Sequence, residues 1–541
     1  MNDTNMYTEQ VSTQAELPPP APTPAQPAQI LPPKRSAKQF FCASNRDLVF
    51  AGILFVLCFL LTDSMFWGGV GIGMALGFVG LYAVSRLYRR SEEKRTRYAV
   101  LCGVLLIAGA VSLVFSCDGI VRFFMVLMLI VLGTVVLEER MQLRTGNSLL
   151  CAVSDFFNTL VGCSVGRLDV GLRALLYETD QTGVSRKRKT GSVLIGLLIA
   201  VPILLVVIPL LASSDAAFEG LVDRLDPVTI GQTIISLLFA LFLCLCLFSQ
   251  LFWAAYADKR RAPVSSFAGI DPAIVGTILT ALSAVYLAYL VSQFAYFFDA
   301  FRGLLPEDYT VAEYARRGFF EMCKVVALNL CLVVLTARLT AKKEGRLPGW
   351  IMALTLFLVL FSLVIVCTAF SKMVLYIQSY GMTRLRILTS VFMLFLTVVL
   401  LCVAIEQFLK KLPTLRIAVL TAALCLALLG FVNVDRVVAA YNVQAYRSGA
   451  LSQLDMDTLT ELNDAAVPYL IRLMDDEDLK IRYAAKKDLR RRLDNLYIIH
   501  NDETRTLLDY DFRAFTLPTW QARQLLLAVE DQLMEQGVPK R

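Results

Sequence analysis

Apolar stretches about 20 residues long recur along the whole chain, and each is long enough to cross a bilayer as an α-helix. This feature restricts the fold strongly, because backbone amides and carbonyls inside a membrane must be paired within the spanning structure itself. We therefore predict an all-α fold, a polytopic helical membrane bundle of about eleven spans. The spans are predicted near residues 48–67, 69–87, 98–116, 120–137, 191–212, 228–256, 274–298, 319–337, 350–370, 387–407 and 417–434.

The composition supports a lipid environment rather than a nucleic-acid partner. The chain is 57% hydrophobic and 18% charged, whereas soluble domains are nearer half apolar and a quarter charged. Its mean hydropathy is +0.61. The net charge of +7 is spread through short loops between spans, a pattern that indicates membrane orientation. The expected partner is the lipid bilayer, and no nucleic acid is expected.

Lysine and arginine positions predict which side of the membrane each loop occupies. One set of loops is rich in basic residues, including 86–97, 186–189, 259–261 and 338–346. The opposite loops are poor in basic residues or balanced by acids, as in 215–226. By the positive-inside rule the first set is cytoplasmic, which places the N-terminus inside. Eleven spans then place the C-terminus outside.

The segment 149–168 does not match the other apolar stretches. It contains Asp155, Asn158 and Arg167, and it is followed by the amphipathic sequence GLRALLYETD. Charged and amide side chains are costly in the centre of a bilayer. We therefore predict an interfacial amphipathic helix here rather than a span.

Three regions are predicted. Residues 1–46 form a Pro-rich cytoplasmic leader that is expected to be disordered, 47–434 form the membrane domain, and 435–541 form a helical extracytoplasmic tail. The tail begins with an amphipathic helix that ends at Gly449. Residues 464–489 then resemble a HEAT-type helix pair, AAVPYLIRLM and KIRYAAKKDL around the turn DDEDL. One such unit cannot bury its own apolar face, so it must pack on a neighbour or a protein partner. Beyond Gly449 we expect a small, polar contact with the membrane domain.

A charged segment precedes the span predicted at 319–337. Thr310 and Glu313 fit a capping box, so a helix is expected to begin there. Glu313, Arg317 and Glu321 then lie on one face with alternating sign. Lys324 follows one turn into the span, where it must be paired or face water. The segment is read either as a juxtamembrane helix whose charges hold a loop, or as a polar site made of Glu313, Arg316, Arg317, Glu321 and Lys324.

Two other predicted outer loops contain polar candidates. Asp215 follows the fifth span, and the segment 371–386 contains Gly381, which is expected to break a helix. Thr383 is placed to cap the next span. Caps of this kind are needed at any helix end, so one interpretation of these residues is purely structural. The alternative is that the outer loops converge on one vestibule. The outer-side candidates are Asp215, Tyr380, Thr383 and Arg386.

Known catalytic and metal-binding patterns are absent from the sequence. The chain has 13 cysteines, most of them inside apolar stretches and none in a CxxC pair, and its single histidine is His500. Disulfide, metal and histidine-based catalytic sites are therefore not expected. The sequence also lacks a phosphate-binding loop and the HExxH and GxSxG motifs. We predict no catalytic residue, no cofactor and no metal, and an enzyme is disfavoured.

Several short motifs resemble a known family. They are LLASSDAAFEGL (210–221), AEYARRGFFE (312–321), YGMTRLR (380–386), the AAYNV sequence near 441 and the AVPYL sequence near 468. Together they resemble a family of bacterial multi-pass membrane proteins known only as domain of unknown function 4173, related to 4153. The resemblance runs from about residue 190 to the end. It implies a bacterial cytoplasmic membrane location but no activity, so no residue receives a role from it.

Three functions remain open at this point. The first is an envelope-associated scaffold, or a signalling or assembly component, whose external tail binds a protein partner. The second is a membrane transporter with a polar site near Glu321 and Lys324, assisted by Asn329. The third is a membrane-embedded transferase that uses acids of the outer loops. The folded tail and the lack of catalytic motifs favour the first.

The orientation can be tested with reporter fusions. Fusions at Lys259 and at Lys343 are expected to report the cytoplasm, and fusions after Gly449 the external side, because the basic loops mark the inner face. Paired fluorescent and alkaline phosphatase reporters measure this, since each is active on one side only. A cytoplasmic tail would contradict the span count, and 149–168 would be the first segment to reassign.

Overall fold

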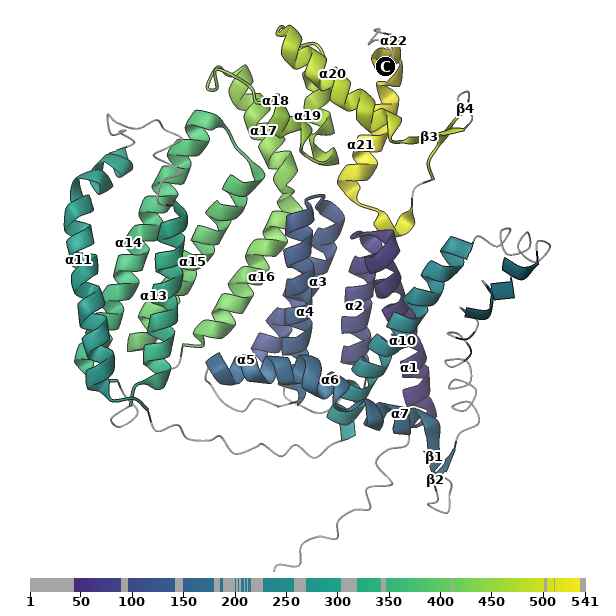
Figure 1. Cartoon of the computed structure of the whole chain (residues 1–541), viewed down its shortest axis with the longest axis horizontal. Helices are drawn as coiled ribbons and strands as arrows, with labels where there is room; N and C mark the ends of the chain where they lie inside the picture. The colour runs from purple at the N-terminus through teal and green to yellow at the C-terminus, as the bar shows by residue number, and fades with distance from the viewer. Residues whose placement is uncertain are drawn as a thin grey trace, which may run out of the picture.

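The computed structural model describes residues 43–88, 96–141, 149–179, 185–187, 200, 203, 206–208, 210–211, 213–215, 227–256, 269–302, 319–341, 347–409, 412–500, 504–509 and 511–535. These residues are almost entirely helical, which confirms the all-α class (Figure 1). The described strands form two short antiparallel hairpins, β1 (Tyr177–Thr179) with β2 (Ser185–Lys187) and β3 (Tyr497–His500) with β4 (Thr504–Leu507).

Eight helices of the described residues are long and apolar enough to cross a membrane. They are α1 (Asn45–Asp63, extended by the π-helical turn η2, Ser64–Gly68), α3 (Arg97–Phe115), α4 (Gly119–Met141), α10 (Pro227–Tyr256), α11 (Pro272–Arg302), α14 (Gly349–Tyr380), α15 (Arg384–Phe408) and α16 (Thr414–Val432). Two further apolar helices, α2 (Ile72–Leu87) and α13 (Phe319–Leu339), coincide with two more predicted spans. The remaining prediction, 191–212, lies mostly outside the described residues.

The spanning helices form two groups joined by α16 (Figure 1). In one group α14 packs against α11, α13 and α15 around an apolar core that includes Leu358 and Ile365. In the other, α1 packs on α2 and α10, and α3 packs on α2 and α4. Helix α16 contacts α15 on one side and α3 and α4 on the other. The packing of α16 therefore fixes how the two groups sit together.

The segment predicted to be interfacial lies across the ends of the spanning helices rather than beside them (Figure 1). It consists of α5 (Leu149–Phe157), the π-helical turn η3 (Asn158–Gly162), α6 (Cys163–Val165) and α7 (Leu168–Leu176). Its exposed apolar residues recur every fourth position, at Val153, Phe157, Val161 and Val165. The opposite face is buried, and there Gln250 of α10 donates to the carbonyl of Thr159. This arrangement agrees with an amphipathic helix at the membrane surface.

The tail forms a compact helical unit at one end of the bundle (Figure 1). Asn433, with a φ of 59°, separates α16 from α17 (Val434–Arg447), and α17 ends just before Gly449, as predicted. The predicted helix pair is α19 (Val467–Arg472) and α20 (Leu479–Asp494), and Asp478 caps α20. The other elements are α18 (Met456–Thr460), η4 (Asp464–Ala466), η5 (Phe512–Ala514), α21 (Leu517–Ala528) and α22 (Glu530–Glu535).

The apolar core of the tail continues into the bundle. Tail residues such as Val438, Leu470 and Leu489 share one buried cluster with Val121 of α4 and Leu429 of α16. Because α17, which precedes Gly449, supplies part of this cluster, a small, polar contact beyond Gly449 stays a prediction. The apolar faces of α19 and α20 need neighbours to cover them, and the end of the bundle contributes part of that cover.

A second attachment joins η5 to the turn between α1 and α2. The amide of Ile72 donates to the carbonyl of Phe515 at 3.0 Å, and the guanidinium of Arg513 pairs with Asp63. The backbone of the tail passes so close that a Cβ on Gly71 would lie 2.7 Å from the carbonyl carbon of Ala514. Glycine is required at this position because the neighbouring atoms belong to the backbone and cannot rotate away.

Gly71→Ala is expected to loosen this attachment. The added methyl group overpacks the contact with η5, which costs about 1–3 kcal/mol, so trypsin should cleave after Arg513 faster than in the wild type. The matched control is Gly52→Ala, since nothing lies within 4 Å of a Cβ at Gly52. Equal cleavage rates in the two variants would contradict the close approach described here.

Candidate functional site

The polar centre of the junction between bundle and tail is the guanidinium of Arg384. Its Nη2 lies 3.0 Å from Oδ2 of Asp435 in α17, and its Nε lies 3.3 Å from Oδ2 of Asp118. The side chains of Asp118 and Asp435 are 2% and 0% exposed, and that of Arg384 is 29% exposed. Two buried carboxylates therefore depend on one partly buried cation for charge compensation.

Local sequence signals explain why these three side chains meet. Gly381, with a φ of 75°, ends α14, and the hydroxyl of Thr383 accepts from the amide of Arg386 to begin α15. Asp118 caps α4 by accepting from the amide of Val121 at 2.9 Å. Asp435 lies in the first turn of α17. Each carboxylate is thus at a helix N-terminus, where the helix dipole favours negative charge.

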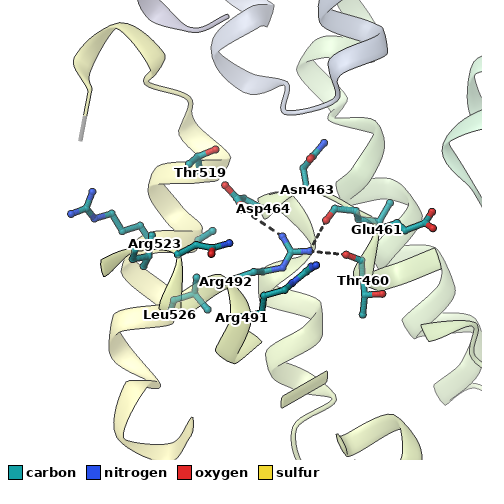
Figure 2. Close-up of a pocket in the computed structure, with 13 residues that line it drawn as sticks. Thr460, Glu461, Asn463, Asp464, Arg491, Arg492, Thr519, Arg523 and Leu526 are labelled. Atoms are coloured by element: carbon teal, nitrogen blue, oxygen red, sulfur yellow. Dashed lines mark hydrogen bonds and ion pairs between the residues drawn. The ribbon is translucent and has the colours of Figure 1, made fainter. Parts of the chain in front are cut away.

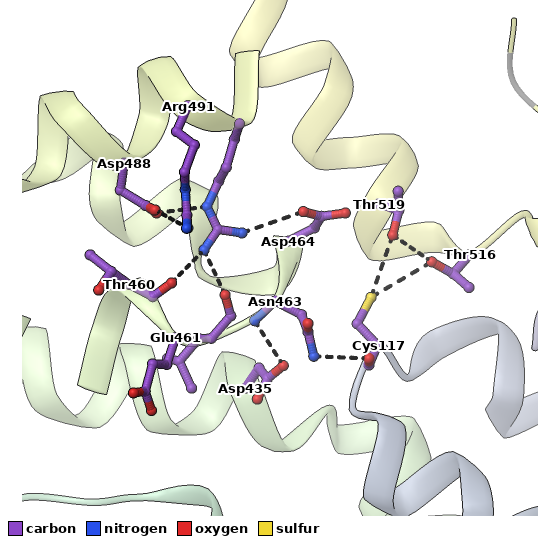
Figure 3. Close-up of polar contacts among 12 residues, drawn as sticks. Cys117, Asp435, Thr460, Glu461, Asn463, Asp464, Asp488, Arg491, Thr516 and Thr519 are labelled. Atoms are coloured by element: carbon purple, nitrogen blue, oxygen red, sulfur yellow. Dashed lines mark hydrogen bonds and ion pairs between the residues drawn. The ribbon is translucent and has the colours of Figure 1, made fainter. Parts of the chain in front are cut away.

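The tail supplies further hydrogen bonds to the same place. The amide of Asn463 donates to Asp435 at 3.1 Å, and its side chain donates to the carbonyl of Cys117 at 2.9 Å (Figure 3). Arg384 also donates to the carbonyl of Glu461 at 3.1 Å. The loop between α18 and η4 is therefore held against the α3–α4 turn and the α14–α15 turn together.

Cys117 lies where α21 covers the α3–α4 turn. Its Sγ is 3.6 Å from the hydroxyl oxygens of Thr516 and of Thr519, which are 2.9 Å from each other (Figure 3). Burial raises the pKa of the Cys117 thiol above its ordinary value. Because the thiolate is the reactive form, this cysteine should be inert while α21 is in place and reactive when it is displaced.

A cavity of about 480 Å³ opens beside this junction, within the tail (Figure 2). Its walls come from the α18–η4 loop, the C-terminal half of α20 and α21. Arg492 fixes one wall, since it pairs with Asp488 at 2.7 Å and Asp464 at 3.4 Å and donates to the carbonyl of Thr460. The lining also includes Arg491, Arg523, Asn463, Asn495 and Glu461. The cavity can accommodate a polar or charged group, and no catalytic arrangement is evident among these side chains.

The charged segment predicted before α13 is only partly within the described structure. Glu313, Arg316 and Arg317 lie outside the described residues, and Glu321 belongs to α13 without a described side chain. Lys324 is exposed on α13. The convergence of these five residues into one polar site therefore remains a prediction.

Inside the same helix group, one network of neutral polar side chains is centred on Asn329. Asn329 of α13 is buried, accepts from the Tyr286 hydroxyl at 2.7 Å and donates to Ser362 at 3.0 Å. Tyr286 also stacks on Phe361, with ring centroids 4.1 Å apart. This network joins α11, α13 and α14, and satisfied polar groups of this kind specify helix packing.

The outer-side candidates of the α14–α15 turn have structural roles. Arg386 donates to the carbonyl of Tyr380 at 3.0 Å and lies over the ring of Tyr376, 3.9 Å from its centroid. Thr383 caps α15 as predicted, and Asp215 is exposed. Tyr380, Thr383 and Arg386 shape the α14–α15 turn, whereas the neighbouring Arg384 makes the contacts with the tail.

Sequence reasoning missed Arg384, Asp118, Asp435 and Asn463. A usable signal was present, because Asp118 and Asp435 each stand at a predicted span boundary and Arg384 belongs to the quoted YGMTRLR motif. Unpaired charges at helix ends on the same side of a membrane are candidates for pairing. Sequence alone does not predict their pairing, because Asp118 also fits an ordinary helix cap and Asp435 an ordinary acid of a first helical turn.

The fold and the junction define a polytopic, α-helical protein embedded in a membrane. The chain belongs to the family described as domain of unknown function (DUF4153), whose profile matches residues 49–473. The match includes the first four predicted spans, which the resemblance seen in the sequence left out. A relation to family 4173 stays a prediction. No curated protein and no solved structure shows significant similarity to the chain.

Arg384→Leu is expected to detach the tail from the junction. Removing one partner of a buried ion cluster costs about 3–5 kcal/mol, because it leaves uncompensated buried charge. At roughly 1.4 kcal/mol per tenfold change, this raises the undocked population by about a hundredfold or more. The measurement is the rate of Cys117 alkylation in lipid nanodiscs, followed by mass spectrometry of the peptide that contains it.

The matched control for that experiment is Arg416→Leu. Arg416 also pairs with a carboxylate, Glu139 at 3.0 Å, but at a site away from the tail. Its loss should leave Cys117 labelling at the wild-type rate. Equal labelling in wild type and Arg384→Leu would show that Arg384 does not hold the tail.

Proposed function

We propose that the protein is a scaffold of the bacterial cytoplasmic membrane, an envelope-associated signalling or assembly component. In this proposal the N-terminus is inside, 47–434 form the membrane domain, and 435–541 form an external tail that binds a protein partner. The basic loops support this orientation. The tail lies at the end of the bundle that carries the α1–α2, α3–α4 and α14–α15 turns, which the same orientation places outside (Figure 1).

The proposal rests on the way in which the tail is attached to the membrane bundle. A shared apolar core and the Arg384 ion cluster join the tail to the α3–α4 and α14–α15 ends of the bundle, and the η5 attachment joins it to the α1–α2 turn. Such a unit holds its outer surface at a fixed position relative to the membrane. A rigid platform of this kind suits the binding of a partner, because little ordering entropy is lost on association.

Transport has less support among the described residues. The buried polar network around Asn329 is neutral and internally bonded, and Lys324 is exposed. Transporter sites are usually formed by broken helices near the middle of the membrane. In the described part of that group, α13 and α14 run without a break from Phe319 to Leu339 and from Gly349 to Tyr380.

The proposal predicts that a partner depends on the docked tail. The chain, tagged at its N-terminus, is purified in native lipid discs, and copurifying proteins are quantified by mass spectrometry. We expect at least one stoichiometric protein with the wild type, and its loss with Arg384→Leu. Lys324→Met also removes one cation, but at the candidate transport site, and it should retain that protein.

Two checks complete this experiment. Equal recovery of the monodisperse membrane protein shows that the variants are folded, and Asp435→Asn replaces Arg384→Leu if the latter does not accumulate. A wild type without a stoichiometric partner would contradict the scaffold. A partner that is lost with Lys324→Met and kept with Arg384→Leu would favour the transporter instead.

A further inference from the structure

Helix α20 presents a mixed basic and apolar face away from the core of the tail. Ile481, Ala485 and Leu489 are buried on its inner side. The outward face is formed by residues at helical spacing on the opposite side, namely Leu479, Lys480, Tyr483, Lys487, Arg490, Arg491 and, at its C-terminal end, Asp494. Leu479 and Tyr483 are 67% and 55% exposed, which is unusual for neighbouring large side chains one turn apart.

The basic groups of this face are available to a ligand. Lys480, Lys487 and Arg490 have no side-chain partner among the residues that the structure describes, whereas Arg491 pairs with Asp488. Arg491 also lines the cavity of about 480 Å³, so the outward face leads into that cavity at its C-terminal end. The face and the cavity together have more basic than acidic side chains, the acids being Asp494 on the face and Glu461 and Asp464 in the cavity lining.

The position of α20 argues against lipid as the occupant. In Figure 1 this helix lies on the side of the tail remote from the spanning helices, with α17, α19 and α21 nearer the bundle. Electrostatic attraction to headgroups declines over about 10 Å at ordinary salt. The surface is therefore positioned for a soluble or externally exposed ligand rather than for the membrane that holds the chain.

The distribution of charge argues against a uniform polyanion. The turn before α20 contains Asp475, Glu477 and Asp478, all exposed, directly beside Leu479. A chain of evenly spaced negative charges would be repelled at this end. A ligand that is apolar near Leu479 and Tyr483 and acidic near Lys487 and Arg490 matches the surface between Leu479 and Arg490.

We propose that the outward face of α20 and the adjoining cavity bind an acidic, amphipathic segment of a partner protein. This inference rests on the proposed scaffold function and specifies its docking surface. Apolar anchors supply the affinity, and the basic residues fix the register of the bound segment. A helical segment with leucines one turn apart, followed by glutamates on the same face, has the required chemistry.

Binding is measured on the full-length protein in lipid nanodiscs by fluorescence anisotropy. The probe is a synthetic peptide of that design, matched to α20 in length, with a scrambled peptide of the same composition and inorganic polyphosphate as comparisons. We expect the designed peptide to bind, and Lys487→Glu/Arg490→Glu to weaken it about tenfold or more at low salt. Leu479→Ala/Tyr483→Ala should weaken it as well, with less dependence on salt.

The matched control is Arg447→Glu/Arg472→Glu, which makes the same charge change at exposed residues of α17 and α19 away from this face. It should bind the peptide like the wild type, and all variants should label at Cys117 at the wild-type rate. The proposal is overturned if the wild type does not bind, if the scrambled peptide or polyphosphate binds equally well, or if Lys487→Glu/Arg490→Glu behaves like the control. If the peptide does not bind as expected but a copurifying partner still depends on Arg384, this docking surface is rejected and the proposed scaffold function is retained.

Discussion

The contact on which the arrangement of the tail depends is the guanidinium of Arg384 between the carboxylates of Asp118 and Asp435. A buried ion cluster is weak evidence for net stability, because desolvating the charges offsets their attraction. In this structure it joins the α14–α15 turn to Asp118 at the start of α4 and to Asp435 in α17, so it aligns these three elements. The planar guanidinium can reach both acids at once, whereas a lysine presents a single point charge.

Apolar packing stabilises the same arrangement of tail and bundle that the ion cluster aligns. The tail core includes Val121 and Leu429 of the spanning helices, so burial of the tail and closure of the bundle end are one process. The η5 attachment then holds the C-terminal part of the tail at the α1–α2 turn, through Arg513 and Asp63. The hydrogen bond and charge of Arg513 hold the pKa of Asp511 below its ordinary value, so this local contribution is present near neutral pH and is lost only in strong acid.

Much of the fold could be predicted because lipid imposes simple rules. Span length, the separation of 149–168 from the spans and the caps at Thr383 and Gly381 follow from local chemistry, and the helix pair α19–α20 follows from its apolar spacing. The junction could not be predicted in the same way. Asp118 satisfies a local cap and Asp435 lies in a first turn that Asn433 already caps, so neither sequence neighbourhood identifies Arg384 as the partner. The shared apolar core could not be predicted either, because the polar composition of 435–541 conceals which apolar residues face the bundle.

Hydrogen exchange of the full-length chain in lipid nanodiscs tests most directly whether tail and bundle form one unit. The account predicts that amides of α17, α19 and α20 are protected to a similar degree as those of α16, and that Arg384→Leu lowers protection across the whole tail together. Amides of α19 and α20 that exchange much faster than those of α16 in the wild type, with no further change in the variant, would contradict it.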